Sequence, residues 1–267
     1  MSSVYLTDCQ YARLVAMKLV SLNVEGNAHF GSVHAFLRDE KPDCFCLQEA
    51  PGYFTETLRA LGYITAYAPM RIETQNGETY ENGIIIGSKL PMVTREHYYF
   101  GTRDVITVHK PDVDETSIQV SPYLIASVTD SDGVEYNIAT THLMVTKDGL
   151  ADEHQKEGAA ALLTLLKDES PHLICGDFNM PRGYNELYEK FTERYTDSIP
   201  KSYTSSLDRD LHRCGKLANL NAPIFDIYMV DYIFTQPPFV ASNVRLQFGI
   251  SDHAAVIADI SRTATRE

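Results

Sequence analysis

Several features that would direct an interpretation are scarce or absent in this chain. It has no tryptophan, only five cysteines in 267 residues, and no apolar run long enough to cross a bilayer. The cysteine count is odd and no metal-binding spacing repeats, so reduced thiols in a reducing compartment are expected. The N-terminus lacks the basic and then apolar pattern of a signal peptide. These absences favour a soluble, cytoplasmic protein with no membrane span.

Basic residues are also scarce. Lys and Arg number 23 against 36 Asp and Glu, which gives a formal net charge of −13. This balance argues against a protein that grips duplex nucleic acid along a long electrostatic footprint. It leaves room for an enzyme that touches a few phosphates beside a bound cation, because the cation itself inverts the local potential.

The composition that is present suits one folded domain. With 44% hydrophobic and 22% charged residues, the chain can bury a sizeable core and shows no compositional sign of disorder. No linker rich in Gly, Ser or Pro and no internal repeat divides it. We therefore interpret residues 1–267 as a single domain, with 1–16 as a peripheral leader, and infer no obligate protein partner.

Hydrophobic periodicity predicts strands throughout the chain, with helices near both ends. Strands are expected at 18–24, 43–49, 83–88, 97–100, 123–130, 135–143, 172–175, 228–235 and 254–260. Helices are expected over 30–40, 53–62 and 150–167, with a rim loop at 74–83 and a mixed polar segment at 182–221. The pattern favours two packed sheets with helices outside.

Several of these apolar strands share one design: each ends in a polar residue able to hold a metal ion or a phosphate. The residues are Asn23, Glu49, His142, Asp177 with Asn179, Asp231, and Asp252 with His253. Taken singly, each is better explained as a turn residue, a solvated carboxylate, a strand cap or a hydrogen-bonded core histidine. Taken together, they predict one pocket of carboxylates, amides and imidazoles, held rigidly by strand ends.

The same residues lie in motifs that resemble a known group. In chain order they are SLNVEG (21–26), CLQEA (46–50), GIIIGSKLPM (83–92), TTHL (140–143), GDFNMP (176–181), VDYIF (230–234) and SDHAAV (251–256). This series is similar to the endonuclease/exonuclease/phosphatase superfamily, the group of deoxyribonuclease I. The resemblance implies an α/β (α+β) fold: a four-layer sandwich of two mostly antiparallel β-sheets packed face to face, with helices on both outer faces.

The resemblance also implies phosphoester hydrolysis with a divalent cation, Mg²⁺ with Mn²⁺ as a substitute. Glu49 is the principal ligand it implies, with Asn23 at the same metal-binding edge and Asp252 near the metal or the phosphate. Elementary chemistry agrees, because a phosphodiester is an anion that repels hydroxide and its charge must be neutralised before attack. Mg²⁺ prefers hard oxygen ligands and keeps several waters, so one or two carboxylates suffice.

Catalytic roles follow from the same motifs. The resemblance implies that Asp177 orients or deprotonates the attacking water, and that Asn179 holds a phosphate oxygen and keeps Asp177 in place. It makes His253 a donor to the phosphoryl oxygen, with Asp231 hydrogen-bonded behind it, and His142 a second phosphate contact. A histidine backed by an aspartate is held in one tautomer and favoured as imidazolium, which suits it to a developing negative oxygen.

Substrate contacts are less well defined by the sequence. Arg209, His212, Arg213 and Lys216 form a local basic cluster on an otherwise acidic chain, and Arg209 and Arg213 are candidate substrate-binding residues. A solvated loop explains them equally well. Gln155 resembles a glutamine common in the family, but the arginine that often precedes it is missing. Tyr53, Phe54 and Tyr80 could stack on a base or simply pack.

Three functions stay open at this point. The first is a metal-dependent phosphodiesterase or nuclease acting on nucleic acid. The second is a phosphatase or phosphodiesterase of a small phosphorylated metabolite or lipid headgroup. The third, a non-catalytic binding domain of the same fold, is disfavoured because Glu49, Asp177 and His253 are all intact.

Overall fold

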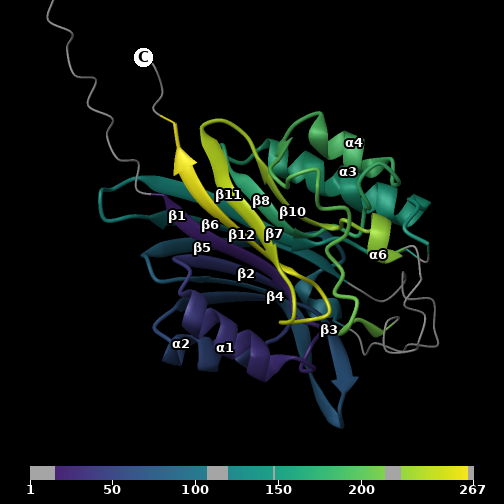
Figure 1. Cartoon of the computed structure of the whole chain (residues 1–267), viewed down its shortest axis with the longest axis horizontal. Helices are drawn as coiled ribbons and strands as arrows, with labels where there is room; N and C mark the ends of the chain where they lie inside the picture. The colour runs from purple at the N-terminus through teal and green to yellow at the C-terminus, as the bar shows by residue number, and fades with distance from the viewer. Residues whose placement is uncertain (1–15, 107–119, 147, 214–223, 264–267) are drawn as a thin grey trace, which may run out of the picture.

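The computed structural model describes residues 16–106, 120–146, 148–213 and 224–263, and two six-stranded sheets pack face to face within them (Figure 1). One sheet has the order β11-β12-β1-β2-β4-β3, with bounds Phe239–Gln247, Ala255–Arg262, Met17–Asn23, Cys44–Pro51, Glu78–Ser88 and Ile64–Gln75. The other has the order β5-β6-β7-β8-β10-β9, with bounds Met92–Phe100, Ser121–Thr129, Glu135–His142, Leu173–Asp177, Asp231–Thr235 and Thr196–Asp197.

Helices cover the outer faces of both sheets, which confirms the predicted sandwich (Figure 1). Helix α1 (Phe30–Glu40) and helix α2 (Phe54–Ala60) lie on one side, and α3 (Glu153–Lys167) and α4 (Leu187–Thr192) on the other. The described residues also include a short 3₁₀ turn (Arg103–Val105) and helix α6 (Ile224–Ile227). Each long helix buries one apolar stripe, as its helical spacing predicts.

A parallel pair of strands lies at the centre of each sheet. Strands β1 and β2 are joined through α1, and β7 and β8 through α3, while the other ladders are antiparallel. Parallel strands end at the same edge of their sheet, and a crossover helix is the connection they require. Asn23 is therefore paired with Gln48, next to Glu49, and His142 is paired with Asp177. The topology thus places the ends of β1 and β2 side by side in one sheet and the ends of β7 and β8 side by side in the other.

Some boundaries and elements differ from the sequence prediction. Residues 74–83 are not a rim loop but part of the β3–β4 hairpin, whose turn places Asn76 and Gly77 at φ 53° and 81°. An Asn-Gly pair favours such a turn, so the signal was present. Strand β3 escaped prediction because Pro69 interrupts its pattern, which an edge strand tolerates.

Strand β11 was not predicted either, because most of its side chains are exposed or half-buried and form no apolar run. The strand predicted at 228–235 begins only at Asp231. Helix α3 begins after Asp152, whose side chain accepts a hydrogen bond from the Gln155 amide at 2.7 Å, and not at Leu150.

Three of the five cysteines can be placed. Cys44, Cys46 and Cys175 are buried in the core with free thiols, as small hydrophobic residues. Cys9 and Cys214 lie outside the described residues, as does the leader apart from residue 16. Among the described residues, no helix combines the length and the apolar character needed to traverse a membrane.

Candidate active site

Asp177 lies at the meeting point of the two sheets and is almost completely buried. Its Oδ2 accepts a hydrogen bond from Asn23 Nδ2 at 3.1 Å, across from the other sheet. The same oxygen lies 3.6 Å from His142 Nε2 and 3.9 Å from His253 Nδ1. Its Oδ1 accepts from the Asn179 backbone amide at 2.9 Å. Residues 154 positions apart in the sequence are thus in direct contact.

The residues on either side of Asp177 fix the position of its carboxylate. Gly176 has φ 146°, and a Cβ there would come within 2.1 Å of the Thr141 carbonyl oxygen, so only glycine fits this close approach of β7 and β8. Phe178 is fully buried against an aromatic cluster. Asn179 then takes φ 48°, the left-handed conformation that asparagine tolerates, which turns its amide back to the carboxylate.

His253 and Asp231 form a hydrogen-bonded pair behind this carboxylate. His253 Nδ1 lies 2.7 Å from Asp231 Oδ2, and Ser206 Oγ donates to the same oxygen at 2.6 Å. Burial opposes the charged imidazole, but Asp231, Asp252 and Asp177 together raise the pKa of His253 well above its ordinary value. The imidazolium form, with its remaining nitrogen available to an anion, is therefore favoured.

Glu49 closes the other side of the cluster, at φ 52°. Its Oε1 lies 3.6 Å from His142 Nε2, and its Oε2 lies 3.4 Å from Arg71 Nη2. Burial raises the pKa of Glu49, but Arg71, His142 and His253 outweigh this and lower it to about 2. Arg71 also pairs with Glu73 at 3.2 Å. Sequence reasoning missed Arg71, because it lies on the unpredicted strand β3.

The carboxylates beside Glu49 suit a hard cation. Burial raises the pKa of Asp252 to about 7, with nearby Glu25 and Glu49 adding to the effect and His253 opposing it. A divalent cation would relieve this concentration of negative charge and takes oxygen ligands. Asn23, the third predicted ligand, donates through Nδ2 to Asp177 and accepts from the Glu25 amide at 3.1 Å, so its amide is already engaged.

A second group also has ligand-like spacing. Asp177, Asp231 and His253 offer atoms that all lie within 4.8 Å of one another. Two of these atoms already share a hydrogen bond at 2.7 Å, and the set includes a nitrogen. Because Mg²⁺ prefers oxygen, the Glu49 side is the better match to that ion and this group the better match to proton transfer.

His142 and Asn179 meet at the rim of the cluster. Asn179 Nδ2 lies 3.1 Å from His142 Nε2 and donates to the Leu143 carbonyl at 2.9 Å. Burial lowers the pKa of His142, although Asp177 and Glu49 partly oppose this. Gln155 is fully buried and donates to the Asn179 and Met144 carbonyls at 3.0 and 2.8 Å. It positions the loop rather than facing a substrate.

The remaining candidates lie further out. Arg209 lines a pocket next to the segment that carries His253 just before β12, and it pairs with Asp226 at 3.3 Å. Arg213 is exposed, and the Lys216 of the same predicted cluster lies outside the described residues. Tyr53 is 43% exposed and lines a separate pocket together with Tyr80.

The two-sheet sandwich with polar strand ends gathered at one edge is the arrangement expected for the family that the sequence motifs resemble. The chain belongs to the Endonuclease/Exonuclease/phosphatase family, whose model matches residues 20–253, and the members of this family are phosphoester hydrolases. No curated protein matches the chain.

Solved structures of the same fold include three informative neighbours. An endonuclease/exonuclease/phosphatase from Beutenbergia cavernae aligns with TM-score 0.69 and 16% identity over 93% of this chain and 72% of its own. D. rerio TDP2, solved with a single-strand DNA product, aligns with TM-score 0.64 and 17% identity over 92% and 99% of the two chains. The Bacteroides thetaiotaomicron mannosyl-6-phosphatase Bt3783 aligns with TM-score 0.63 and 15% identity over 92% and 99%.

Proposed function

We propose that the protein is a Mg²⁺-dependent phosphoester hydrolase, most simply a phosphodiesterase acting on nucleic acid. The observation that carries the proposal is the buried contact of Asp177 with two histidines, His142 and His253, opposite an ionised Glu49. A structural core would not bury this much charge in one place, whereas a site that must handle a phosphate anion needs it.

Glu49 and Asp252 would hold the cation, with Asn23 beside them. The bound ion supplies neutralisation of the phosphate charge and lowers the pKa of a coordinated water. Mn²⁺ also takes carboxylate oxygen and would substitute. The Glu49 carboxylate is ready for this role, because its lowered pKa keeps it ionised at any physiological pH.

The protein's own groups would do the rest. Asp177 orients the attacking water and accepts its proton, held in place by the Asn23 side chain and the Asn179 backbone amide. His253, kept protonated by Asp231, donates to a non-bridging phosphoryl oxygen as negative charge develops there. His142 and the Asn179 side chain, whose Nε2 and Nδ2 atoms lie 3.1 Å apart, would contact a second oxygen.

A second candidate is hydrolysis of a small phosphorylated metabolite or lipid headgroup. The net charge of −13 and a neighbouring pocket of only about 380 Å³ favour compact substrates over long duplexes. The structural neighbours span both kinds of substrate, since one was solved with a DNA product and another is a mannosyl-6-phosphatase. Buried free thiols favour a cytoplasmic location for either activity.

A substrate panel with controlled metal tests the proposal. Single- and double-stranded DNA, RNA, nucleotide cofactors, inositol phosphates and a phosphocholine lipid are incubated with Mg²⁺, with EDTA, and with EDTA followed by excess Mg²⁺ or Mn²⁺. We expect turnover that EDTA stops and either ion restores. Turnover unchanged by complete chelation rules out the metal role, and no turnover of any ester leaves a binding domain. Cleavage of small esters alone selects the second candidate.

A further inference from the structure

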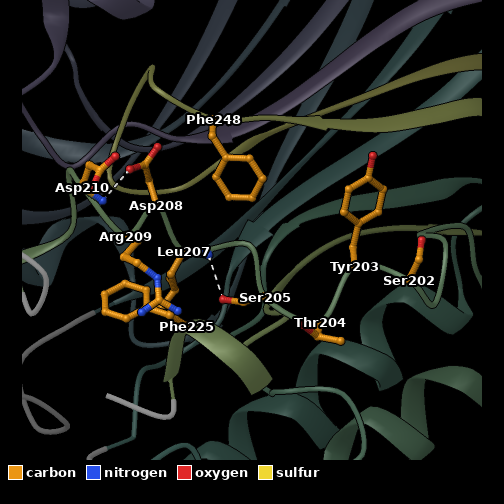
Figure 2. A pocket seen from close by; sticks show the side chains of 10 residues that line it. All are labelled: Ser202, Tyr203, Thr204, Ser205, Leu207, Asp208, Arg209, Asp210, Phe225 and Phe248. Atoms are coloured by element: carbon orange, nitrogen blue, oxygen red, sulfur yellow. Dashed lines mark hydrogen bonds between the residues drawn. The ribbon is translucent and has the colours of Figure 1, made fainter. Parts of the chain in front are cut away.

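A pocket of about 380 Å³ is lined by Leu207, the residue bridged to His253, and by nine other residues whose side chains Figure 2 shows. Its apolar lining includes Leu207, Phe225 and Phe248, and its polar lining includes Arg209 and Asp210. Phe248 is 46% exposed, unusual for a phenylalanine side chain, and in Figure 2 its ring points into the open space. The Arg209 guanidinium lies 4.9 Å from the centre of the Phe225 ring.

The wall of this pocket is joined directly to the strand end that carries His253. Leu207 forms a β-bridge with His253. On either side of it, the Asp208 amide donates to the Asp252 carbonyl at 2.7 Å, and the Ala254 amide donates to the Ser206 carbonyl at 2.7 Å. The pocket therefore begins one strand spacing, about 5 Å, from the histidine proposed to hold the phosphate.

Asp208, itself only 4% exposed, fixes both walls of the pocket to each other. Its Oδ1 accepts from the Asp210 and Leu211 amides at 2.9 and 3.0 Å. Its Oδ2 accepts from the Gly249 amide at 2.6 Å, which holds the turn that presents Phe248. The exposure of the Phe248 ring is thus built into the fold by a buried carboxylate, and the ring is available as a preorganised surface.

We propose that this pocket binds a planar, nucleobase-sized ring attached to the phosphate, so that the preferred substrate is a nucleotide ester and not an aliphatic phosphate. This inference rests on the proposed phosphoester hydrolysis and names its substrate class. A base stacks on an aromatic face regardless of its identity, and Phe248 offers such a face. The carboxylate of Asp210 in the lining can accept hydrogen bonds from exocyclic amino groups.

A matched pair of ligands tests the proposal directly. Adenosine 5′-monophosphate and ribose 5-phosphate carry the same phosphate and sugar and differ by the base. Their binding to the full-length protein is measured by calorimetry in EDTA, where hydrolysis does not interfere. We expect the nucleotide to bind about tenfold more tightly, as stacking on one aromatic side chain provides. Phe248→Ala is expected to abolish the difference and Phe248→Tyr to retain it.

Tyr53→Ala is the matched control, because Tyr53 is an aromatic of similar exposure, 43%, in a different pocket. It should leave the preference for the nucleotide unchanged. Equal binding of the two ligands by the unaltered protein, or a preference that survives Phe248→Ala or disappears in Tyr53→Ala, would overturn the assignment. Because binding is measured without metal, failure of the hydrolysis assay would be seen separately and would not be confused with these outcomes.

Discussion

The half-buried Glu49 and the buried Asp177 are two carboxylates that face the same imidazole nitrogen from opposite sheets. Each has an oxygen 3.6 Å from His142 Nε2. Their acidities nevertheless differ in direction. The pKa of Glu49 is lowered to about 2, whereas burial and the neighbouring Asp231 raise the pKa of Asp177, despite the opposing effect of His253 and His142. At one site, the pKa of the Glu49 carboxyl is thus lowered and that of the Asp177 carboxyl is raised.

The cause lies in the second neighbour of each carboxylate. Glu49 has the Arg71 guanidinium at 3.4 Å, while Asp177 shares its surroundings with the Asp231 carboxylate. A neighbouring cation favours ionisation and a neighbouring anion disfavours it. A ligand for a divalent ion must stay charged, and a base must be able to take a proton. In the proposed mechanism, the sheet that carries Glu49 would therefore bind the metal, and the sheet that carries Asp177 would carry out proton transfer.

The largest effect should come from the proton-transfer side. Asp177→Ala and His253→Ala are each expected to lower kcat by about 10³-fold or more, because each removes a group proposed to act on the reacting atoms. Steady-state hydrolysis of the best substrate in the panel measures this. Circular dichroism should show that both variants stay folded. Full activity in either variant would refute the roles assigned to these residues.

Glu49→Gln should fail in a different way. Losing a charged ligand weakens cation binding, so the Mg²⁺ concentration for half-maximal activity should rise by about 10- to 100-fold, with activity partly restored at high Mg²⁺. Asp177→Asn is the matched comparison and should gain nothing from added Mg²⁺. Equal rescue of both variants, or of neither, would mean that the two carboxylates do not divide the work as proposed.

Arg71→Gln should give a smaller loss, about tenfold in kcat/KM, because Arg71 acts on Glu49 as a positioning residue and does not itself react. Arg71→Lys keeps the charge and should recover part of the loss. The diagnostic measurement is the Mg²⁺ titration, which should shift in Arg71→Gln in the same direction as in Glu49→Gln. A loss of kcat with an unchanged Mg²⁺ requirement would contradict this role.

The sequence predicted the parts of the site that lie at the ends of buried strands. An apolar run that stops at a polar residue is visible in the chain, and parallel β1–β2 and β7–β8 pairs then place those ends together. Asn23, Glu49, His142 and Asp177 could be named for this reason. The spatial convergence itself was an inference from motifs, since no local pattern specifies which strands will be neighbours.

The parts that were missed lie on elements without a periodic signal. Arg71 is on an edge strand interrupted by Pro69, and Ser206, which donates to Asp231, lies in the polar segment between β9 and α6. Asp208 was missed because its function is to bind three backbone amides, which depends on tertiary structure alone. Residues that position other residues leave less trace in a single sequence than residues that end strands.

The smallest effect, and the sharpest comparison, concerns stability without metal. At pH 7 in EDTA, Glu49→Gln should lower the free energy of unfolding, by roughly 1–3 kcal/mol, and Asp177→Asn should raise it. The signs follow from the pKa shifts. Ionised Glu49 stabilises the fold above its unfolded pKa of about 4.3, and this is lost as the pH falls towards about 2. Ionised Asp177 costs stability once the pH exceeds its unfolded pKa of about 3.9.

Urea unfolding of the two variants and the unaltered protein at several pH values measures both contributions. The two variants should differ from the unaltered protein in opposite directions at pH 7. The effect of Asp177→Asn should disappear as the pH is lowered to the unfolded pKa of about 3.9, whereas that of Glu49→Gln should decline between about 4.3 and about 2. If Asp177 is kept as a catalytic base at a cost in stability, Asp177→Asn should have a higher free energy of unfolding than the unaltered protein and a lower activity. Destabilisation by both substitutions would show that Asp177 is held as a structural carboxylate, and the contrast with Glu49 would fail.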